Sequence, residues 1–299
     1  MTSENMEEVH YDSIGTPRGR NKQMYDALVT IDEQNVAHST FTTYSYETDC
    51  YTDARLAFYF QIIQEAAGAH AASRGYSLPE MNKEGKTWVI TRIRMEVFRY
   101  THWPEVLKVE TWAQDPIRLH IPRVVRAFDT EGNLIFIAKT HWAILDLERN
   151  RPCRPKDMSF RIGIPPKDDS EHSLDMHLEN NRHGEDADLH QLTVHSPRIT
   201  YLDTDRNQHV NNISYLSWAL ESLPSSFRNR LKVAEVDVSY LRQTFLEDTI
   251  VVYTESKDPD ALKKDEPLLH HRIIRKETDG TETLVWVGST RWKAREDLR

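Results

Sequence analysis

Hydrophobic positions follow the same order of patterns twice along this chain, beginning with a β-rich run at Thr40–Tyr46. A helix is predicted over about Asp53–Ser73, because Leu56 and Ile63, with several aromatic and aliphatic neighbours, recur at helical spacing. Its apolar residues surround nearly the whole helix, which is typical of a buried helix. Four strands rich in Val, Ile, Thr and Trp are predicted after it, at Trp88–Phe98, Val106–Ala113, Arg118–Asp129 and Leu134–Asp146.

The second half of the chain repeats this order. It predicts a strand at His195–Leu202, a helix at Val210–Leu223, and strands near Val233–Leu241, Thr249–Ser256, Pro267–Lys276 and Thr283–Arg295. Each half is therefore expected to be an α+β unit in which an antiparallel sheet wraps one helix. A single five-stranded sheet would leave an edge and a face uncovered, so we expect the two units to pair side by side.

The two halves read as copies of one building block. YETDCYTDARLAFYFQIIQEAA begins at residue 46 and YLDTDRNQHVNNISYLSWALES at residue 201, and a shift of 156 positions aligns them. Where the first copy has Tyr51 and Asp53, the second has Asn207 and His209. We predict a polar tail over residues 1–39, a first repeat over 40–163, an acidic His-rich linker over 164–195 and a second repeat over 196–299.

Composition narrows the class of protein. A net charge of −9 over 299 residues argues against nucleic acid binding. No apolar run approaches the roughly 20 residues that cross a bilayer. Cys50 and Cys153 provide no disulfide framework and fit a reducing cytoplasm, and the acidic, polar N-terminus resembles neither a signal nor a transit peptide. We interpret the histidines of the linker as part of a solvated connector, and predict neither metal nor cofactor: His172, His177, His183, His190 and His195.

A cluster of reactive side chains precedes the second helix. Asp205, Asn207 and His209 are spaced by two residues, and alternate residues of an extended segment share a face. Beside a helix N-terminus, where negative charge is favoured, this set suits hydrolysis at a carbonyl: Asp205 and His209 would activate water, and Asn207 would stabilise the oxyanion. Helix capping is the alternative interpretation, and we assign Asn211 and Asn212 to capping and helix-start geometry. The first copy forms the same junction without Asn or His, which favours chemistry.

The residues around this cluster resemble a known family. DTDRNQHVNNISYLSWALESLP, residues 203–224, resembles the Asp-x-Asn-x-His-Val-Asn-Asn…Tyr…Trp…Glu-Ser segment of the acyl-acyl-carrier-protein thioesterases. WVITRIRMEVFRYTHWPEVLKVETW, residues 88–112, is similar to that family's Trp-Val-(Ile/Val)-Thr-Arg block. The resemblance covers roughly Phe41–Arg295. It implies a tandem hot-dog fold that hydrolyses fatty acyl thioesters of acyl carrier protein (ACP), ending fatty-acid elongation.

The resemblance also implies roles for parts of the chain. The acyl chain would enter the N-terminal hot dog and the C-terminal one would supply catalysis, with the family's Asp, Asn and His carried onto Asp205, Asn207 and His209. Family members often have Glu, and plant members a following Cys, where this chain has Gln243 and Thr244. Glutamine cannot act as a base and threonine is no thiolate, so we predict direct attack by water, with Gln243 holding water or substrate.

Other expectations concern the surroundings of the site and the rival functions. Glu247 is expected at a hairpin turn. A basic run at the end of the first repeat is our candidate contact for ACP or for its phosphopantetheine phosphate: Arg149, Arg151, Arg154, Lys156 and Arg161. The alternatives are an acyl-CoA thioesterase, a hot-dog hydratase or dehydratase using His209, and a non-catalytic acyl-binding module. Fusion internalises the two-fold pairing, so a monomer suffices, and a homodimer is the other possibility.

Overall fold

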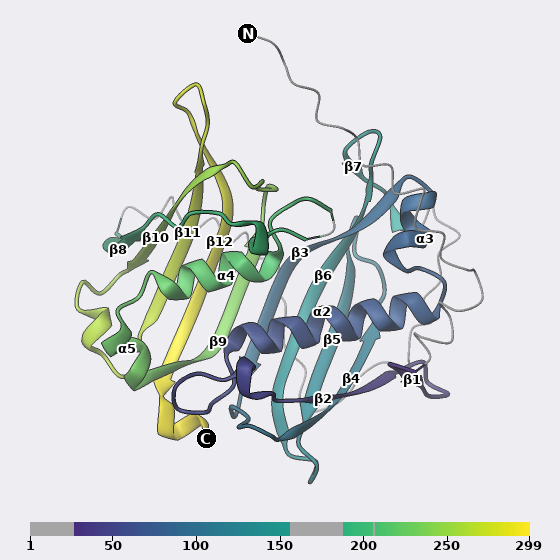
Figure 1. The fold of residues 1–299 in the computed structure, drawn as a ribbon, viewed down its shortest axis with the longest axis horizontal. Coiled ribbons are helices and arrows are strands. Elements are labelled where there is room, and N and C mark those ends of the chain that lie inside the picture. The colour runs from purple at the N-terminus through teal and green to yellow at the C-terminus, as the bar shows by residue number, and fades with distance from the viewer. Residues whose placement is uncertain (1–26, 156–187, 206) are drawn as a thin grey trace.

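The computed structural model describes residues 27–155, 188–205 and 207–299, and a single curved sheet organises them (Figure 1). The sheet has 12 strands in the order β1-β2-β4-β5-β6-β3-β9-β12-β11-β10-β8, with β7 paired to β6. The strands are β1 (Thr30–Ile31), β2 (Ala37–Thr42), β3 (Lys86–Val97), β4 (Val106–Ala113), β5 (Ile121–Phe128), β6 (Leu134–Asp146), β7 (Arg151–Pro152), β8 (His190–His195), β9 (Leu231–Tyr240), β10 (Thr249–Ser256), β11 (Leu268–Lys276) and β12 (Glu282–Ala294). The helices are α2 (Leu56–Ser73), α3 (Leu78–Lys83), α4 (Asn212–Glu221) and α5 (Ser225–Arg230).

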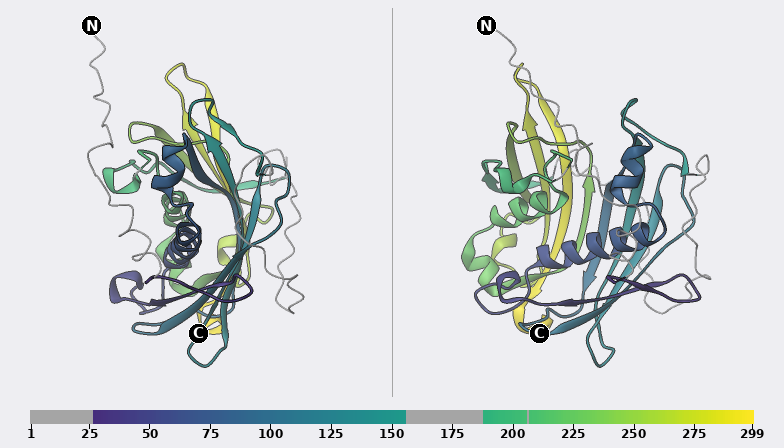
Figure 2. Two further views of the ribbon diagram at one scale, coloured as in Figure 1. Left: turned by 90° about the vertical axis from the view of Figure 1, so that its right-hand side faces the viewer. Right: turned by 45° about the vertical axis from the view of Figure 1, so that its right-hand side comes forward.

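Each half of the sheet curves around one central helix, as the side views show (Figure 2). Helix α2 lies over the strands of the first repeat, and α4 lies over those of the second (Figure 1). The prediction of a buried helix is confirmed for α2, in which residues such as Tyr59, Phe60 and Ile63 are wholly buried. The architecture is the α+β tandem hot dog that the sequence predicts.

The two repeats join edge to edge through β3 and β9. These strands pair antiparallel from Arg92 opposite Ser239 to Glu96 opposite Glu235, which makes one continuous sheet. Across this seam the Arg92 guanidinium donates two hydrogen bonds to Asp237, of 2.9 and 2.7 Å. One hydrophobic core cluster extends through both repeats. Side-by-side pairing of the copies is therefore confirmed.

The backbone also confirms the duplication and its offset of 156 positions. A 3₁₀ turn at Ser45–Glu47 recurs at Tyr201–Asp203. An isolated bridge between Thr48 and Ala54 recurs between the equivalent residues 204 and 210. The left-handed φ of 67° at Thr52 recurs as 61° at Gln208. Backbone features repeated at one offset show that both loops before the central helices have the same conformation.

Several predicted boundaries are wrong. Instead of a strand at His195–Leu202, β8 occupies His190–His195 and a 3₁₀ turn follows it. The turn forms because Asp203 accepts hydrogen bonds from the Thr200 backbone N–H and hydroxyl, at 2.8 and 2.7 Å. Strand β8 thus lies within the predicted linker, and β1 with the start of β2 within the predicted tail. Residues 1–26 and 156–187 lie outside the described residues, and with them His172, His177, His183, Lys156 and Arg161.

The sequence analysis did not predict the two short helices. Helix α3 starts at a capping box, in which the Ser77 hydroxyl accepts a hydrogen bond from the Glu80 N–H and the Glu80 carboxylate accepts one from the Ser77 N–H. Helix α5 follows Pro224, and its six residues are too few to show a helical period. None of the helices in the described part of the chain is long and apolar enough to cross a membrane.

Candidate active site

The loop between the 3₁₀ turn and α4 is a closed turn, not the extended segment that the sequence analysis assumed. The Asp205 N–H donates to the His209 carbonyl at 2.8 Å, and the Gln208 N–H donates to the Asp205 carbonyl at 2.9 Å. Gln208 takes the left-handed conformation that this turn requires. Asp205, Asn207 and His209 are therefore brought together by turn geometry, and alternation along a strand was the wrong reason for their convergence.

Hydrogen bonds fix this loop at both ends. The Val210 N–H donates to the Thr244 carbonyl at 2.8 Å. Helix α4 begins at Asn212, and the Asn211 side chain caps it by accepting a hydrogen bond of 3.0 Å from the Ile213 N–H. The capping role predicted for Asn211 is confirmed. Asn212 is the first residue of α4, which confirms its predicted place at the helix start, and its carbonyl accepts a hydrogen bond from the Tyr240 hydroxyl at 3.1 Å.

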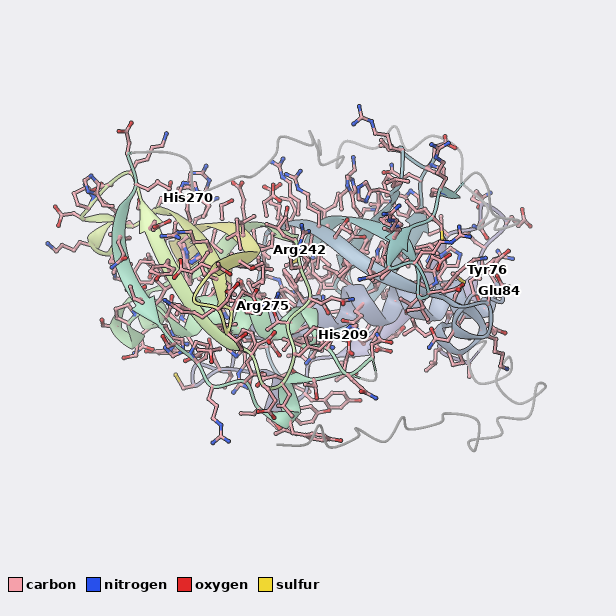
Figure 3. All side chains as sticks on the ribbon, turned by 90° about the horizontal axis from the view of Figure 1, so that it is seen from above. Tyr76, Glu84, His209, Arg242, His270 and Arg275 are labelled. Carbon is pink, nitrogen blue, oxygen red and sulfur yellow. The ribbon has the colours of Figure 1, made fainter. Side chains whose placement is uncertain are left out.

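A cavity of about 840 Å³ lies beside the loop and is shared by the two repeats. Asp205, Asn207, His209 and Gln243 of the second repeat all line it. The first repeat contributes mostly apolar and small side chains of α2, β3, β5 and β6, among them Ala67, Gly68, Ala71, Val89, Ile90, Ile121 and Trp142. In the view from above, His209 lies near the middle of the molecule, Arg242 and Arg275 towards the second repeat, and Tyr76 towards the far end of the first (Figure 3).

The environment of His209 favours a neutral imidazole. Its ring is half-buried and meets the Phe245 ring edge-on, with centroids 5.1 Å apart. Burial lowers its pKa below the usual 6.5, because the charged form loses hydration, and the nearby Asp205 carboxylate partly opposes that shift. A neutral ring nitrogen at physiological pH is able to take a proton from water.

Asp205 holds the loop as well as facing the cavity. One of its carboxylate oxygens accepts a hydrogen bond from the Asn207 N–H at 2.8 Å. This bond fixes the Asn207 backbone, and the Asn207 side chain lines the cavity. The negative charge of Asp205 stabilises a protonated His209, so the pair suits a step in which the imidazole takes up a proton.

Residues after β9 complete this side of the cavity. Gln243 lines it, and its carbonyl accepts a hydrogen bond of 2.8 Å from Arg275. Glu247 lies in a turn between β9 and β10, but these strands do not pair, so the predicted hairpin is wrong; Glu247 does not line the cavity. Cys50 and Cys153 are free thiols, and neither lines the cavity, so a thiolate nucleophile has no place there.

One acidic group of this site, Glu65, was not predicted from the sequence. In the part of the chain that the structure describes, Asp205 and Glu65 are the carboxylates lining the cavity. Glu65 belongs to α2 of the first repeat, and the offset of 156 positions makes Glu221 its counterpart in the second repeat. The sequence shows that Glu65 lies three residues before Gly68, so both lie on one side of the helix. This spacing does not show which loop faces that side, so it could not identify Glu65 as a site residue.

The equivalent loop of the first repeat is closed by charges. Asp53 is wholly buried and pairs with Arg295, with His102 at 3.1 Å and with Lys232 at 3.8 Å. Asp49 of the same loop also pairs with Arg295, at 2.8 Å. This cluster of charged side chains surrounds the loop that is equivalent to the loop of Asn207 and His209. Of the two equivalent loops, that of the second repeat borders the open cavity.

No group of three or more potential metal-binding side chains occurs within residues 27–155, 188–205 and 207–299. His190 and His195 of the predicted connector lie on the edge strand β8.

Comparison with known proteins identifies the family of this chain. Residues 34–160 match the model of the acyl-ACP thioesterase N-terminal domain, and residues 186–293 match that of the C-terminal domain. An oleoyl-acyl carrier protein thioesterase of Coriandrum sativum is 27% identical over 229 residues, covering 70% of this chain and 60% of its own length. A palmitoyl-acyl carrier protein thioesterase of Gossypium hirsutum is 27% identical over 300 residues, covering 94% and 68%.

Solved structures show the same fold. An acyl-ACP thioesterase from Bacteroides thetaiotaomicron superposes with a TM-score of 0.67 at 20% identity, covering 88% of this chain and 100% of that one. A 12:0-ACP thioesterase from Umbellularia californica gives a TM-score of 0.67 at 22% identity, covering 87% and 94%. The chain spans 60% and 63% of the length of two plant oleoyl-acyl carrier protein thioesterases that it matches. With both domain models matched in order over most of its length, the chain belongs to the acyl-ACP thioesterase family.

Proposed function

We propose that this protein hydrolyses fatty acyl thioesters carried by ACP, releasing a free fatty acid and the carrier thiol. One observation carries the proposal: Asp205, Asn207 and His209 lie at one side of a largely apolar cavity of about 840 Å³ that continues into the first repeat. An apolar pocket with a few convergent polar groups is the usual form of a site for a lipid-like substrate. The relatives that match both halves are named for hydrolysis of acyl-ACP.

The geometry supports direct attack by water. Neutral His209 takes a proton from a water molecule while the water oxygen bonds to the thioester carbon. Asp205 stabilises the imidazolium that forms. The negative charge on the carbonyl oxygen is received by the Asn207 amide and by the start of α4 at Asn212. The carbon–sulfur bond then breaks, the thiolate leaves with the electron pair, and the proton on His209 returns to sulfur. Gln243 orients the water or the thioester by hydrogen bonding.

We assign the carrier from charge. ACP is acidic and carries its acyl chain on a phosphopantetheine arm, so a basic surface near the cavity would bind it. Arg149 and Arg151 flank Asn150, which lines the cavity, and Arg154 follows β7. Arg242 lines the cavity itself and is exposed. We propose that these arginines receive the carrier and its phosphate.

The same proposal covers location and assembly. Cys50 is an exposed free thiol, which agrees with a reducing compartment such as the cytoplasm. Both halves of the paired sheet belong to one chain, so a monomer contains the whole site.

A thiol-release assay with acyl-ACP tests the function. The wild-type protein should release thiol, and His209→Ala and Asp205→Ala should each lower kcat/KM by about 10²-fold or more. His190→Ala, at an exposed position of β8, is the matched histidine control and should keep full activity. Thermal unfolding should show all three variants folded. Near-wild-type rates in both His209→Ala and Asp205→Ala would contradict the assignment.

The carrier is tested separately. The same acyl chain is supplied on ACP and on CoA, and kcat/KM should be higher for ACP. Replacing Arg149, Arg151 and Arg154 with Glu should raise KM for acyl-ACP more than for acyl-CoA. Equal KM values for acyl-ACP before and after these replacements would remove the proposed docking surface. Hydration of an enoyl thioester without thiol release would instead indicate a hydratase.

A further inference from the structure

A charged side chain lies in the wall of the acyl cavity, away from the catalytic loop. Arg123 projects from β5 on the face that also carries Ile121 and Val125, and it lines the cavity while being only 4% exposed. Burial lowers its pKa to about 10, so it is still a cation at neutral pH. A buried cation in apolar surroundings is costly unless a partner compensates it.

The protein partners of Arg123 are neutral. One terminal nitrogen of its guanidinium donates to His70 Nδ1 and to the Thr111 hydroxyl, each at 3.1 Å. Burial and the neighbouring arginine lower the pKa of His70 to about 3, so this ring is uncharged. Within residues 27–155, 188–205 and 207–299, no carboxylate forms an ion pair with Arg123. Elsewhere, by contrast, partly buried arginines such as Arg92 and Arg272 are paired with carboxylates.

The second repeat shows that the fold does not require a charge at this position. Arg123 lies opposite Thr140, two residues before Trp142. By the same register, Leu269 lies opposite Thr290, two residues before Trp292. Leu269 is wholly buried in the core. The repeat that packs solidly therefore has leucine at this place, and the repeat with the cavity has arginine.

Buried threonine hydroxyls do not require an arginine either. In the second repeat, Thr254 and Thr290 are hydrogen-bonded at 2.8 Å by the two ring nitrogens of His271. Thr254 is the repeat equivalent of Thr111, the hydroxyl that Arg123 contacts. A histidine can thus satisfy this layer of the core without placing a guanidinium in a cavity.

The position of Arg123 corresponds to the body of a bound acyl chain. The catalytic loop faces Trp88 and Val89 of β3. Strand β6 separates β5 from β3, so Arg123 lies two strands, roughly 10 Å, across the sheet from β3. A chain whose thioester is at His209 would pass Ile90 and Trp142 and meet the guanidinium several carbons from the carbonyl.

We propose that Arg123 is a specificity residue that receives an oxygen-bearing group on the acyl chain, several carbons from the thioester. The chemistry is that of a hydrogen-bond acceptor for a guanidinium, a carboxylate being the stronger partner and a hydroxyl the weaker. The substrates would then include oxygenated acyl chains as well as plain ones. This inference rests on the proposed thioesterase function, and its test has a binding arm that does not depend on turnover.

The turnover arm compares acyl-ACP substrates of several lengths that end in a methyl, a hydroxyl or a carboxyl group. At one or more lengths, the wild-type kcat/KM for the oxygen-ended chain should equal or exceed that for the methyl-ended chain. Arg123→Met keeps an unbranched side chain without charge. It should lower the ratio of kcat/KM for the oxygen-ended chain to kcat/KM for the methyl-ended chain at least tenfold. Arg123→Lys should keep part of the preference for the carboxyl-ended chain. Arg126→Met, on the opposite face of β5, is the matched control and should leave the ratio unchanged.

The binding arm uses isothermal titration with linear dicarboxylic and monocarboxylic acids of matched length. Tighter binding of the dicarboxylic acid to wild type, lost in Arg123→Met, supports the inference even if no thiol is released from any substrate. If methyl-ended chains are hydrolysed and every oxygen-ended chain is rejected in both arms, the inference is wrong while the function stands. The inference is also wrong if wild type and folded Arg123→Met show the same preference for oxygen-ended over methyl-ended chains. If Arg123→Met does not unfold cooperatively, the preferences of the wild-type protein and of Arg123→Lys decide whether the inference holds.

Discussion

Replacing Ala71 with phenylalanine should shorten the acyl chains that the protein accepts. Ala71 lies in α2, and both Ala71 and Trp142 line the cavity. The residue 156 positions later is Phe227, which packs edge-on against Trp292 with ring centroids 4.9 Å apart. A phenylalanine side chain at residue 71 would fill part of the cavity.

The size of the effect follows from the methylenes displaced. If the added ring takes the room of about four methylenes, the loss for a long chain is about 3 kcal/mol, at about 0.8 kcal/mol for each buried CH₂. That corresponds to a decrease in kcat/KM on the order of 10²-fold for the longest chains, and little change for short ones. Thiol release is measured over a series of acyl-ACP lengths, with thermal unfolding as the check on folding.

The matched control is Ala57→Phe, which places the same ring on the same helix at a residue that does not line the cavity. It should leave the length profile as it is in the wild-type protein. If Ala71→Phe is folded and keeps the wild-type length profile, the acyl chain does not occupy the space beside Ala71. The assignment of this cavity to the acyl chain would then be wrong.

Three further predictions concern pH, stability and the thiols. Because burial lowers the pKa of His209, kcat/KM should fall on acidification with a midpoint below pH 6.5, since protonation removes the base; a midpoint above 6.5 in a pH–rate profile would contradict this. Asp53→Asn should lower the free energy of unfolding in urea by about 3–5 kcal/mol, because it removes the wholly buried carboxylate of the cluster and leaves Arg295 and Lys232 with the half-buried Asp49, whereas Asp265→Asn, in an exposed ion pair, should change it little. Cys50→Ser and Cys153→Ser should keep nearly full thiol-release rates, and a loss near 10²-fold in either would revive a covalent mechanism.

The sequence predicted the repeats and the sheet because both depend on local pattern. Strands Val106–Ala113, Leu134–Asp146 and Thr249–Ser256 begin and end where expected, since their β-branched residues lie between clear turn signals. The strand expected at His195–Leu202 failed because the Asp203 carboxylate binds Thr200 and closes a turn within an apolar stretch. Side-chain capping competes with strand formation, and hydropathy alone does not register it.

Only the site residues that are close together in the sequence could be predicted from their pattern. Asp205, Asn207 and His209 are neighbours along the chain, so their types and spacing were visible, although the turn that joins them was not. Gln243 was found through the family resemblance. Glu65 was missed because the catalytic loop lies in the other half of the chain. The pairing of β3 with β9 brings the two halves together, and no local pattern encodes that contact.

Comparison of the two loops explains why a duplicated fold has one open site. The pairing of β3 with β9 makes Val89, which lines the cavity, the repeat equivalent of Lys232. Strand β6 pairs with β3 as β12 pairs with β9, and this register makes Leu145 the equivalent of Arg295. These two cations bind Asp53, whose counterpart in the open loop is His209. Replacing apolar wall residues with cations and the imidazole with a carboxylate turns a substrate site into a buried ion cluster. That cluster holds the C-terminal segment against the first repeat, so the closed copy of the site contributes stability where the open copy provides space for a substrate.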